Sequence, residues 1–179
     1  LGHPLEVRHE HNWHRIMSPD VYGKEHPEWF AEIDGQRYPK HYSEKRGGQV
    51  CTSNPQVVEH FAKVAIAHFD KYPTADMFSI AANDGRKFCT CRECEALDSG
   101  RVRPDGRRVL TDRFITFSNQ IAERAAKVHP DKQLGVIIYL DYKYAPQNVK
   151  PHPMLFLVHP TNSGFSQGAF YEGDEWSEA

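Results

Sequence analysis

The chain has 179 residues, of which 39% are hydrophobic and 26% are charged, a composition typical of a globular domain with a core. Its formal net charge of -2 gives no positive field for phosphates, which argues against nucleic acid as a partner. The longest apolar runs, residues 134–140 and 154–158, are too short to cross a bilayer, so no membrane span is expected.

The two ends of the chain indicate a piece of a longer protein. The sequence begins at Leu1 without a Met and stops at Ala179, after an aromatic and acidic stretch. We therefore expect a single domain over residues 1–179 that is an internal fragment, with flanking parts of its own chain missing.

The first third of the chain predicts short elements separated by turns. Residues 6–14 are typical of a strand end followed by a polar loop. Pro27 favours a short helical turn at its first position. The pair Asp34-Gly35 predicts a tight turn between two short extended segments.

The middle of the chain contains the clearest strand, helix and strand unit. Residues 49–52 predict a short strand. Asn54 and Pro55 then provide an N-cap and a first helical residue, and apolar residues follow at helical spacing until Tyr72-Pro73 ends the helix. Residues 76–82 form an apolar run typical of a buried parallel strand.

A second unit of the same kind follows. Thr111-Asp112 predicts the cap of a helix that closes at His129-Pro130, and residues 134–140 and 154–158 predict two further strands. This alternation indicates an α/β fold with a parallel sheet. No glycine-rich phosphate turn follows Ala82, which favours a (β/α) barrel of TIM type over a doubly wound sheet, here a partial barrel of about five strands.

Polar side chains follow the predicted strands at the edge where such sheets place their functional residues. Asp84, after the strand that ends at Ala82, is a candidate general acid, and the adjacent Asn83 is a candidate amide for orienting a substrate. Asn-Asp-Gly is also a common turn sequence, so a purely structural role stays open. The candidate sugar contacts at the same edge are His9, His11, Trp13, Asp141 and Tyr142.

Four cysteines form the most specific local pattern. Cys89, Cys91 and Cys94 lie in a Cys-rich loop at residues 88–98, and Cys51 follows the strand at 49–52. Together they predict a tetrahedral, structural zinc site. One or two disulfides, or free thiols, are the alternatives that the spacing leaves open. No organic cofactor is predicted.

Several blocks resemble a known family. Residues 24–31, 35–37, 49–55, 83–85 and 88–94 occur in the order found in a bacterial family catalogued as a domain of unknown function. Its members often carry an N-terminal domain like that of α-glucuronidases. The resemblance covers roughly residues 8–160 and implies a barrel similar to hexosaminidase-type glycoside hydrolases.

The resemblance also implies site roles. Asn83 and Asp84 match the adjacent pair in which the first residue orients an acetamido group and the second is the general acid. Tyr139 or Tyr142 would support the acetamido oxygen. No second catalytic carboxylate is assignable, so the substrate itself would supply the nucleophile.

These observations lead to one principal hypothesis and two alternatives. The principal one is hydrolysis of a carbohydrate, including an N-acetylated sugar, which would favour a periplasmic or extracellular location. The alternatives are a carbohydrate-binding module without catalysis, and a structural or interaction domain held together by zinc.

Overall fold

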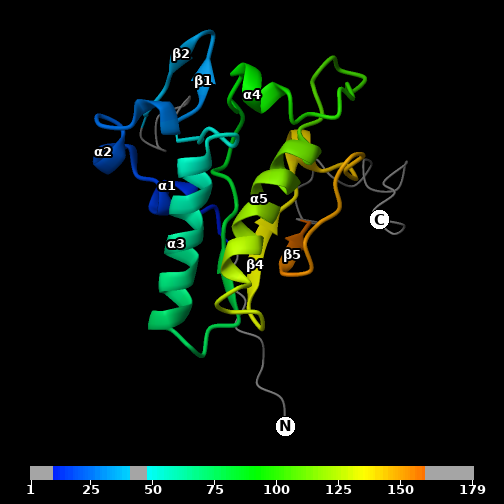
Figure 1. Cartoon of the computed structure of the whole chain (residues 1–179). Coiled ribbons are helices and arrows are strands. Elements are labelled where there is room, and N and C mark those ends of the chain that lie inside the picture. Colours follow the sequence, from blue (N-terminus) through cyan, green and yellow to red (C-terminus); the bar gives the residue numbers. More distant parts are fainter. Residues whose placement is uncertain (1–9, 41–47, 160–179) are drawn as a thin grey trace.

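Three parallel strands form the main sheet of the computed structural model, which describes residues 10–40 and 48–159 (Figure 1). The strands are β3 (Met77–Ser79), β4 (Gln133–Ile137) and β5 (Leu155–Val158), in the order β3-β4-β5. On the other side of β3, His11 forms a parallel bridge with Ala81. The N-terminal segment therefore extends the sheet by one further position.

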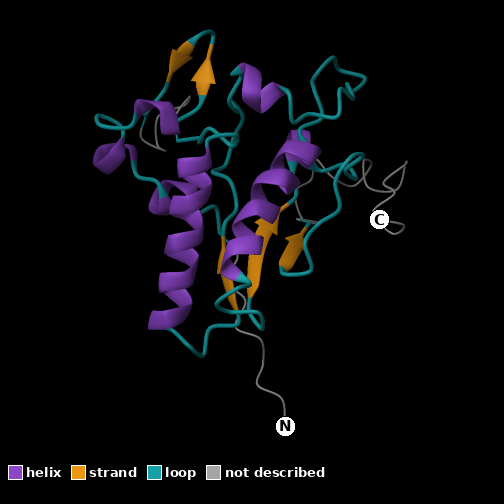
Figure 2. Cartoon of the chain, in the orientation of Figure 1, coloured by secondary structure: helices purple, strands orange, loops and turns teal. Residues whose placement is uncertain are grey.

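Two long helices cover one face of this sheet (Figure 2). They are α3 (Pro55–Lys71) and α5 (Thr111–Ala125), and they pack against each other. The side chain of Asn54 caps α3 by accepting a hydrogen bond from the Gln56 N–H at 2.9 Å, as the sequence predicts. At α5 the sequence predicts a cap at Thr111-Asp112, but the N-cap residue is Leu110. The carboxylate of Asp112 instead accepts hydrogen bonds from the backbone N–H groups of Gln147 and Asn148.

The core lies between the helices and the sheet. Trp13 stacks on Phe114 with ring centroids 5.6 Å apart and meets Phe61 and Phe117 edge-on. Its indole N–H donates to the Ile80 carbonyl at 2.7 Å. Because one aromatic cluster contacts both helices and the β3 segment, it fixes how these elements pack.

Short elements surround this framework. They are α1 (Trp13–Ile16), α2 (Pro19–Tyr22), η1 (Pro27–Trp29), β1 (Glu32–Ile33), β2 (Gln36–Arg37), α4 (Arg92–Glu95) and η2 (Leu140–Tyr142). β1 and β2 form an antiparallel hairpin. Its turn residues have positive φ angles, 52° at Asp34 and 75° at Gly35, which confirms the predicted tight turn.

The sheet differs from the prediction in size and in one strand. Within the described residues it has three parallel strands instead of five, so a partial α/β fold is present and a TIM barrel is not shown. Residues 49–52 were expected to join the parallel sheet, but Val50 forms an antiparallel bridge with Phe30. A short apolar run predicts that a strand is buried, but it does not predict whether the strand pairs in a parallel or an antiparallel direction. No helix of residues 10–40 and 48–159 is long and apolar enough to cross a membrane.

Candidate metal centre and candidate active-site rim

The four cysteines converge on one point. Cys51 follows the bridge at Val50. Cys94 lies in the short helix α4, Cys91 is its N-cap residue, and Cys89 lies two residues earlier. All four are buried and free, and their Sγ atoms lie within 4.8 Å of one another. The distances from Cys51 Sγ to the Sγ atoms of Cys91 and Cys94 are both 3.7 Å. We call these four residues the cysteine cluster.

The sulfur–sulfur distances exclude one of the alternatives that the sequence left open. A disulfide has a sulfur–sulfur distance of about 2.0 Å, so no disulfide is formed. Four buried thiols this close together can hold a metal ion. The structure therefore confirms that the four cysteines are close enough together to hold a metal ion.

Polar groups from neighbouring segments point at the sulfur atoms. The backbone N–H of Glu32 donates to Cys89 Sγ at 3.2 Å, and Nη1 of Arg37 lies 3.6 Å from the same atom. The hydroxyl of Ser53 lies 3.1 Å from Cys94 Sγ. Donors of this kind stabilise thiolates, and metal sites use them to orient their ligands.

The electrostatics of the cluster favour an ionised sulfur. The thiols of Cys89 and Cys94 donate to Cys51 and lower its pKa to about 3, against the opposing effect of burial, with help from Ser53 and Arg37. Cys51 and Cys94 in turn raise the pKa of Cys89. Burial tends to lower the pKa of Arg37, but Cys51 and Cys89 outweigh it and raise that pKa. The thiolate is the form of cysteine that binds metal.

A second group of predicted residues meets at the carboxyl ends of β3 and β4. The hydroxyl of Tyr139 donates to Oδ1 of the exposed Asp84 at 2.9 Å. The His11 ring lies 6.2 Å from the Tyr139 ring, and its Nδ1 donates to the Ala82 carbonyl. We call Asp84, Tyr139 and His11 the rim. The predicted contact His9 lies outside the described residues.

Asp141 organises the arginines beside the rim. Its side chain is 9% exposed and accepts a hydrogen bond from Nη1 of Arg103 at 2.5 Å. Nε of Arg86 lies 3.4 Å from its second oxygen. A carboxylate held in this way orients guanidinium groups, and the side chain of Arg86 is more exposed than that of Asp141.

Three other predicted site residues are buried in the structure. Trp13 and Tyr142 are each 1% exposed, so neither ring is open for stacking on a sugar. Asn83 is fully buried: its Oδ1 accepts the backbone N–H and the ring Nδ1 of His14, both at 2.9 Å, and its Nδ2 donates to the Gly48 carbonyl. Its amide therefore connects the segment before Asp84 to His14 and Gly48.

Two arginines contact these sites although no sequence motif predicted them. Arg37 reaches Cys89 across 52 positions of the chain, and Arg103 reaches Asp141 across 38. Neither lies in a motif with the residue it contacts. Ser53 lies in the block 49–55, and its closeness to Cys51 is the only local indication of its contact with the cluster.

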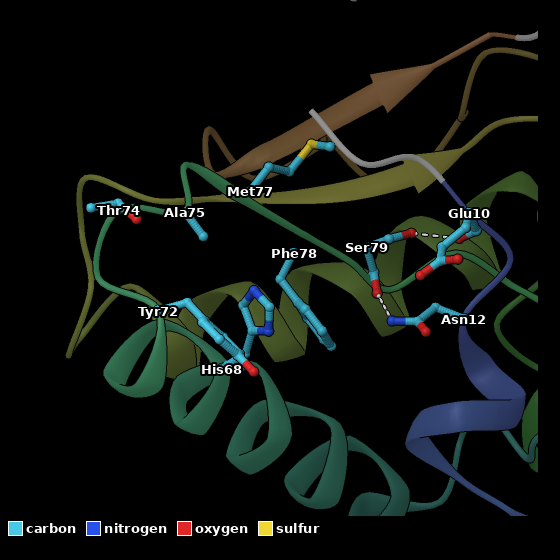
Figure 3. A pocket seen from close by; sticks show the side chains of 9 residues that line it. All are labelled: Glu10, Asn12, His68, Tyr72, Thr74, Ala75, Met77, Phe78 and Ser79. Atoms are coloured by element: carbon cyan, nitrogen blue, oxygen red, sulfur yellow. Dashed lines mark hydrogen bonds between the residues drawn. The ribbon is translucent and has the colours of Figure 1, made fainter. Parts of the chain in front are cut away.

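A pocket of about 430 Å³ lies away from both groups (Figure 3). It runs along the edge of β3, where Ser79 donates to the Glu10 carbonyl and accepts, through its own carbonyl, from Asn12. His68 and Tyr72 of the α3 end close it on one side. Glu10, Asn12, His68, Tyr72, Thr74, Ala75, Met77, Phe78 and Ser79 line it. None of the predicted site residues is among them.

Comparisons with known proteins identify a family and no individual relative. Neither the comparison with curated proteins nor the one with solved structures gives a match. A family model matches residues 3–159, which is most of the chain. The chain therefore belongs to the family described as Domain of unknown function (DUF4838).

Proposed function

We propose that the cysteine cluster binds one structural zinc ion, and that this is the function the geometry supports best. The supporting observation is the pair of 3.7 Å distances from Cys51 Sγ to Cys91 Sγ and Cys94 Sγ. Four thiolates at a Zn–S distance of about 2.3 Å form a tetrahedron with sulfur–sulfur edges of about 3.8 Å. An iron–sulfur cluster places several irons and sulfides between its cysteines and would need wider spacing.

Metal analysis of the purified chain tests this proposal. We expect one zinc per chain in the wild type, and much less after Cys91→Ser or Cys94→Ser. Thr90→Ala is the matched control, because Thr90 lies between two ligands and its exposed hydroxyl donates to the Glu32 carbonyl. Cobalt reconstitution should give the absorption of a tetrahedral thiolate site. Four reactive thiols with no bound metal would contradict the proposal.

A second candidate function is hydrolysis of a glycosidic bond at the rim. The supporting observation is the hydrogen bond from Tyr139 to Asp84, which joins two residues at the carboxyl ends of neighbouring parallel strands. Parallel α/β sheets place their active sites at this edge. The order of His11, β3, β4 and β5 follows the chain, which is the order of a barrel, so we propose that the sheet is an arc of a (β/α) barrel.

The rim residues would divide the chemistry as follows. Asp84 gives its proton to the glycosidic oxygen as the bond from that oxygen to the anomeric carbon breaks. The acetamido oxygen of an N-acetylated sugar forms the new bond to this carbon, giving a cyclic oxazolinium. Water then adds to the anomeric carbon as its bond to the acetamido oxygen breaks, which restores the acetamide, and a proton of the water passes to the Asp84 carboxylate. Tyr139 holds Oδ1 of Asp84, and His11 and Arg86 contact the substrate.

Turnover of an aryl N-acetylhexosaminide tests this second candidate. Asp84→Asn should lower kcat by roughly 10²–10⁴-fold, because the proton donor is lost. Asp131→Asn is the control, since Asp131 is exposed and precedes β4 at the opposite end of the strand. Equal turnover in both variants would refute the role of Asp84. Carbohydrate binding by the wild type without turnover would instead support a non-catalytic binding module.

A further inference from the structure

One short loop connects the rim to the cysteine cluster. Only residues 85–88 separate Asp84 from Cys89, and they form neither helix nor strand. Two of them have φ angles in the left-handed region, 108° at Gly85 and 70° at Lys87. A loop without backbone pairing of its own takes its conformation from the groups that hold its ends.

The amino end of this loop is held by Asn83, through the hydrogen bonds to His14 and Gly48 described above. Gln49 adds a third link, because its Nε2 donates to the Asn83 carbonyl at 2.9 Å. His14 reaches the Asn83 amide from α1, whereas Gly48 and Gln49 lie on the segment that leads to Cys51.

The carboxyl end is held by packing and by the cluster itself. Phe88 is 8% exposed and meets Phe114 and Tyr142 edge-on, with ring centroids 5.0 and 5.5 Å apart. The backbone carbonyl of the next residue, Cys89, accepts a hydrogen bond from Nη1 of the buried Arg113 at 2.5 Å. Its sulfur accepts the Glu32 N–H. The position of Cys89 therefore sets where Phe88 lies.

We infer that metal binding by the cysteine cluster positions Asp84, so that the cluster is a positioning site for the rim. The inference rests on the proposed zinc site, and its catalytic consequence rests on the proposed hydrolysis. An ion coordinated by all four sulfur atoms links Cys89 to Cys51, which lies four residues before the start of α3 at Pro55. Without it, Cys89 is held at its sulfur by hydrogen bonds alone, and the loop carrying Asp84 gains freedom at one end.

Amide hydrogen exchange on the full chain tests the inference without needing turnover. The zinc-loaded chain is compared with the same chain after zinc removal by a chelator, with zinc content measured on both samples. We expect exchange in residues 84–90 to accelerate by at least about tenfold, while residues 58–69 of α3 change by less than about twofold.

Three outcomes would overturn the inference in distinguishable ways. Unchanged exchange in residues 84–90 after zinc loss would leave the zinc proposal intact and refute the positioning role. Equal acceleration in α3 would show that the metal supports the whole domain and not the loop. Absence of zinc from the wild type would refute both proposals, whereas absence of turnover would leave the exchange result valid.

A variant that keeps all four cysteines provides a second test. Phe88→Leu should retain one zinc per chain but still accelerate exchange in residues 84–87, because the edge contacts to Phe114 and Tyr142 are lost. Phe156→Leu is the matched control, since Phe156 is 37% exposed on β5. Exchange equal to that of the control would exclude Phe88 as the link.

Discussion

The hydroxyl of Tyr139 donates to Oδ1 of Asp84 at 2.9 Å, joining the segments that follow β4 and β3. A hydrogen bond to a charged group contributes about 1.5–3 kcal/mol, so Tyr139→Phe should reduce turnover of an aryl N-acetylhexosaminide by roughly 10- to 100-fold. Tyr144→Phe, on the same loop, serves as the control, and equal turnover in the two variants would contradict the pairing.

Asn83 should behave as a structural residue and not as a substrate ligand. Asn83→Ala removes a fully buried amide and leaves the His14 N–H and the Gly48 carbonyl without their partner. Buried groups left unpaired cost about 1–3 kcal/mol each, so the free energy of unfolding should fall by about 2 kcal/mol or more. Urea denaturation measures it against the exposed Asn148→Ala. Full stability with a raised KM would restore the substrate role.

The sequence predicted those elements that are determined by residues close together in the chain. The helix from Pro55 follows from the Asn54 cap and the apolar spacing, and the hairpin turn from Asp34-Gly35. The cysteine cluster was also predictable, because three of its members lie within six positions of one another. Each of these features is decided by residues close together in the chain.

What escaped prediction depends on contacts between distant segments. Val50 pairs with Phe30 in an antiparallel bridge, a direction that its own side chain does not specify. Trp13 follows a strand and suits either a sugar platform or a core, and only its packing on Phe114 assigns it to the core. The burial of Asn83 likewise comes from His14 and Gly48, which no motif connects to it.

Arg113 and Asp98 should contribute strongly to stability as a buried ion pair. Nε and Nη2 of Arg113 lie 2.9 and 2.6 Å from the two carboxylate oxygens, and the side chains are only 3% and 4% exposed. Burial raises the pKa of Asp98 although Arg113 opposes it. Asp98→Ala leaves a buried cation and should cost about 3–5 kcal/mol. Arg124→Ala breaks an exposed pair with Glu59 and should cost less than about 1 kcal/mol in the same thermal unfolding experiment.

Arg37 should tune zinc affinity without changing stoichiometry. Its Nη1 contacts Cys89 Sγ and donates to the Phe30 carbonyl at 3.0 Å, which places a positive charge beside the thiolates. Arg37→Met should weaken zinc binding by roughly 10- to 100-fold, the usual effect of losing a group that supports a metal ligand. Competition with a chromogenic chelator measures the Kd. Gln36→Ala, exposed in the same hairpin, is the control, and an equal Kd in both would exclude Arg37 from the site.

His68 should make stability depend on pH. Its ring contacts Phe78 and Tyr72, with centroids 4.6 and 5.0 Å apart, and burial lowers its pKa below the ordinary 6.5. As the pH falls below about 6.5, the unfolded chain binds a proton that the folded chain does not, so the free energy of unfolding decreases. His68→Gln should remove this part of the slope in urea denaturation between pH of about 7.5 and 5, whereas the exposed Val128→Ala should keep it. Glu10 lines the same pocket. Identical slopes in the two variants would show that burial does not lower the pKa of the His68 ring.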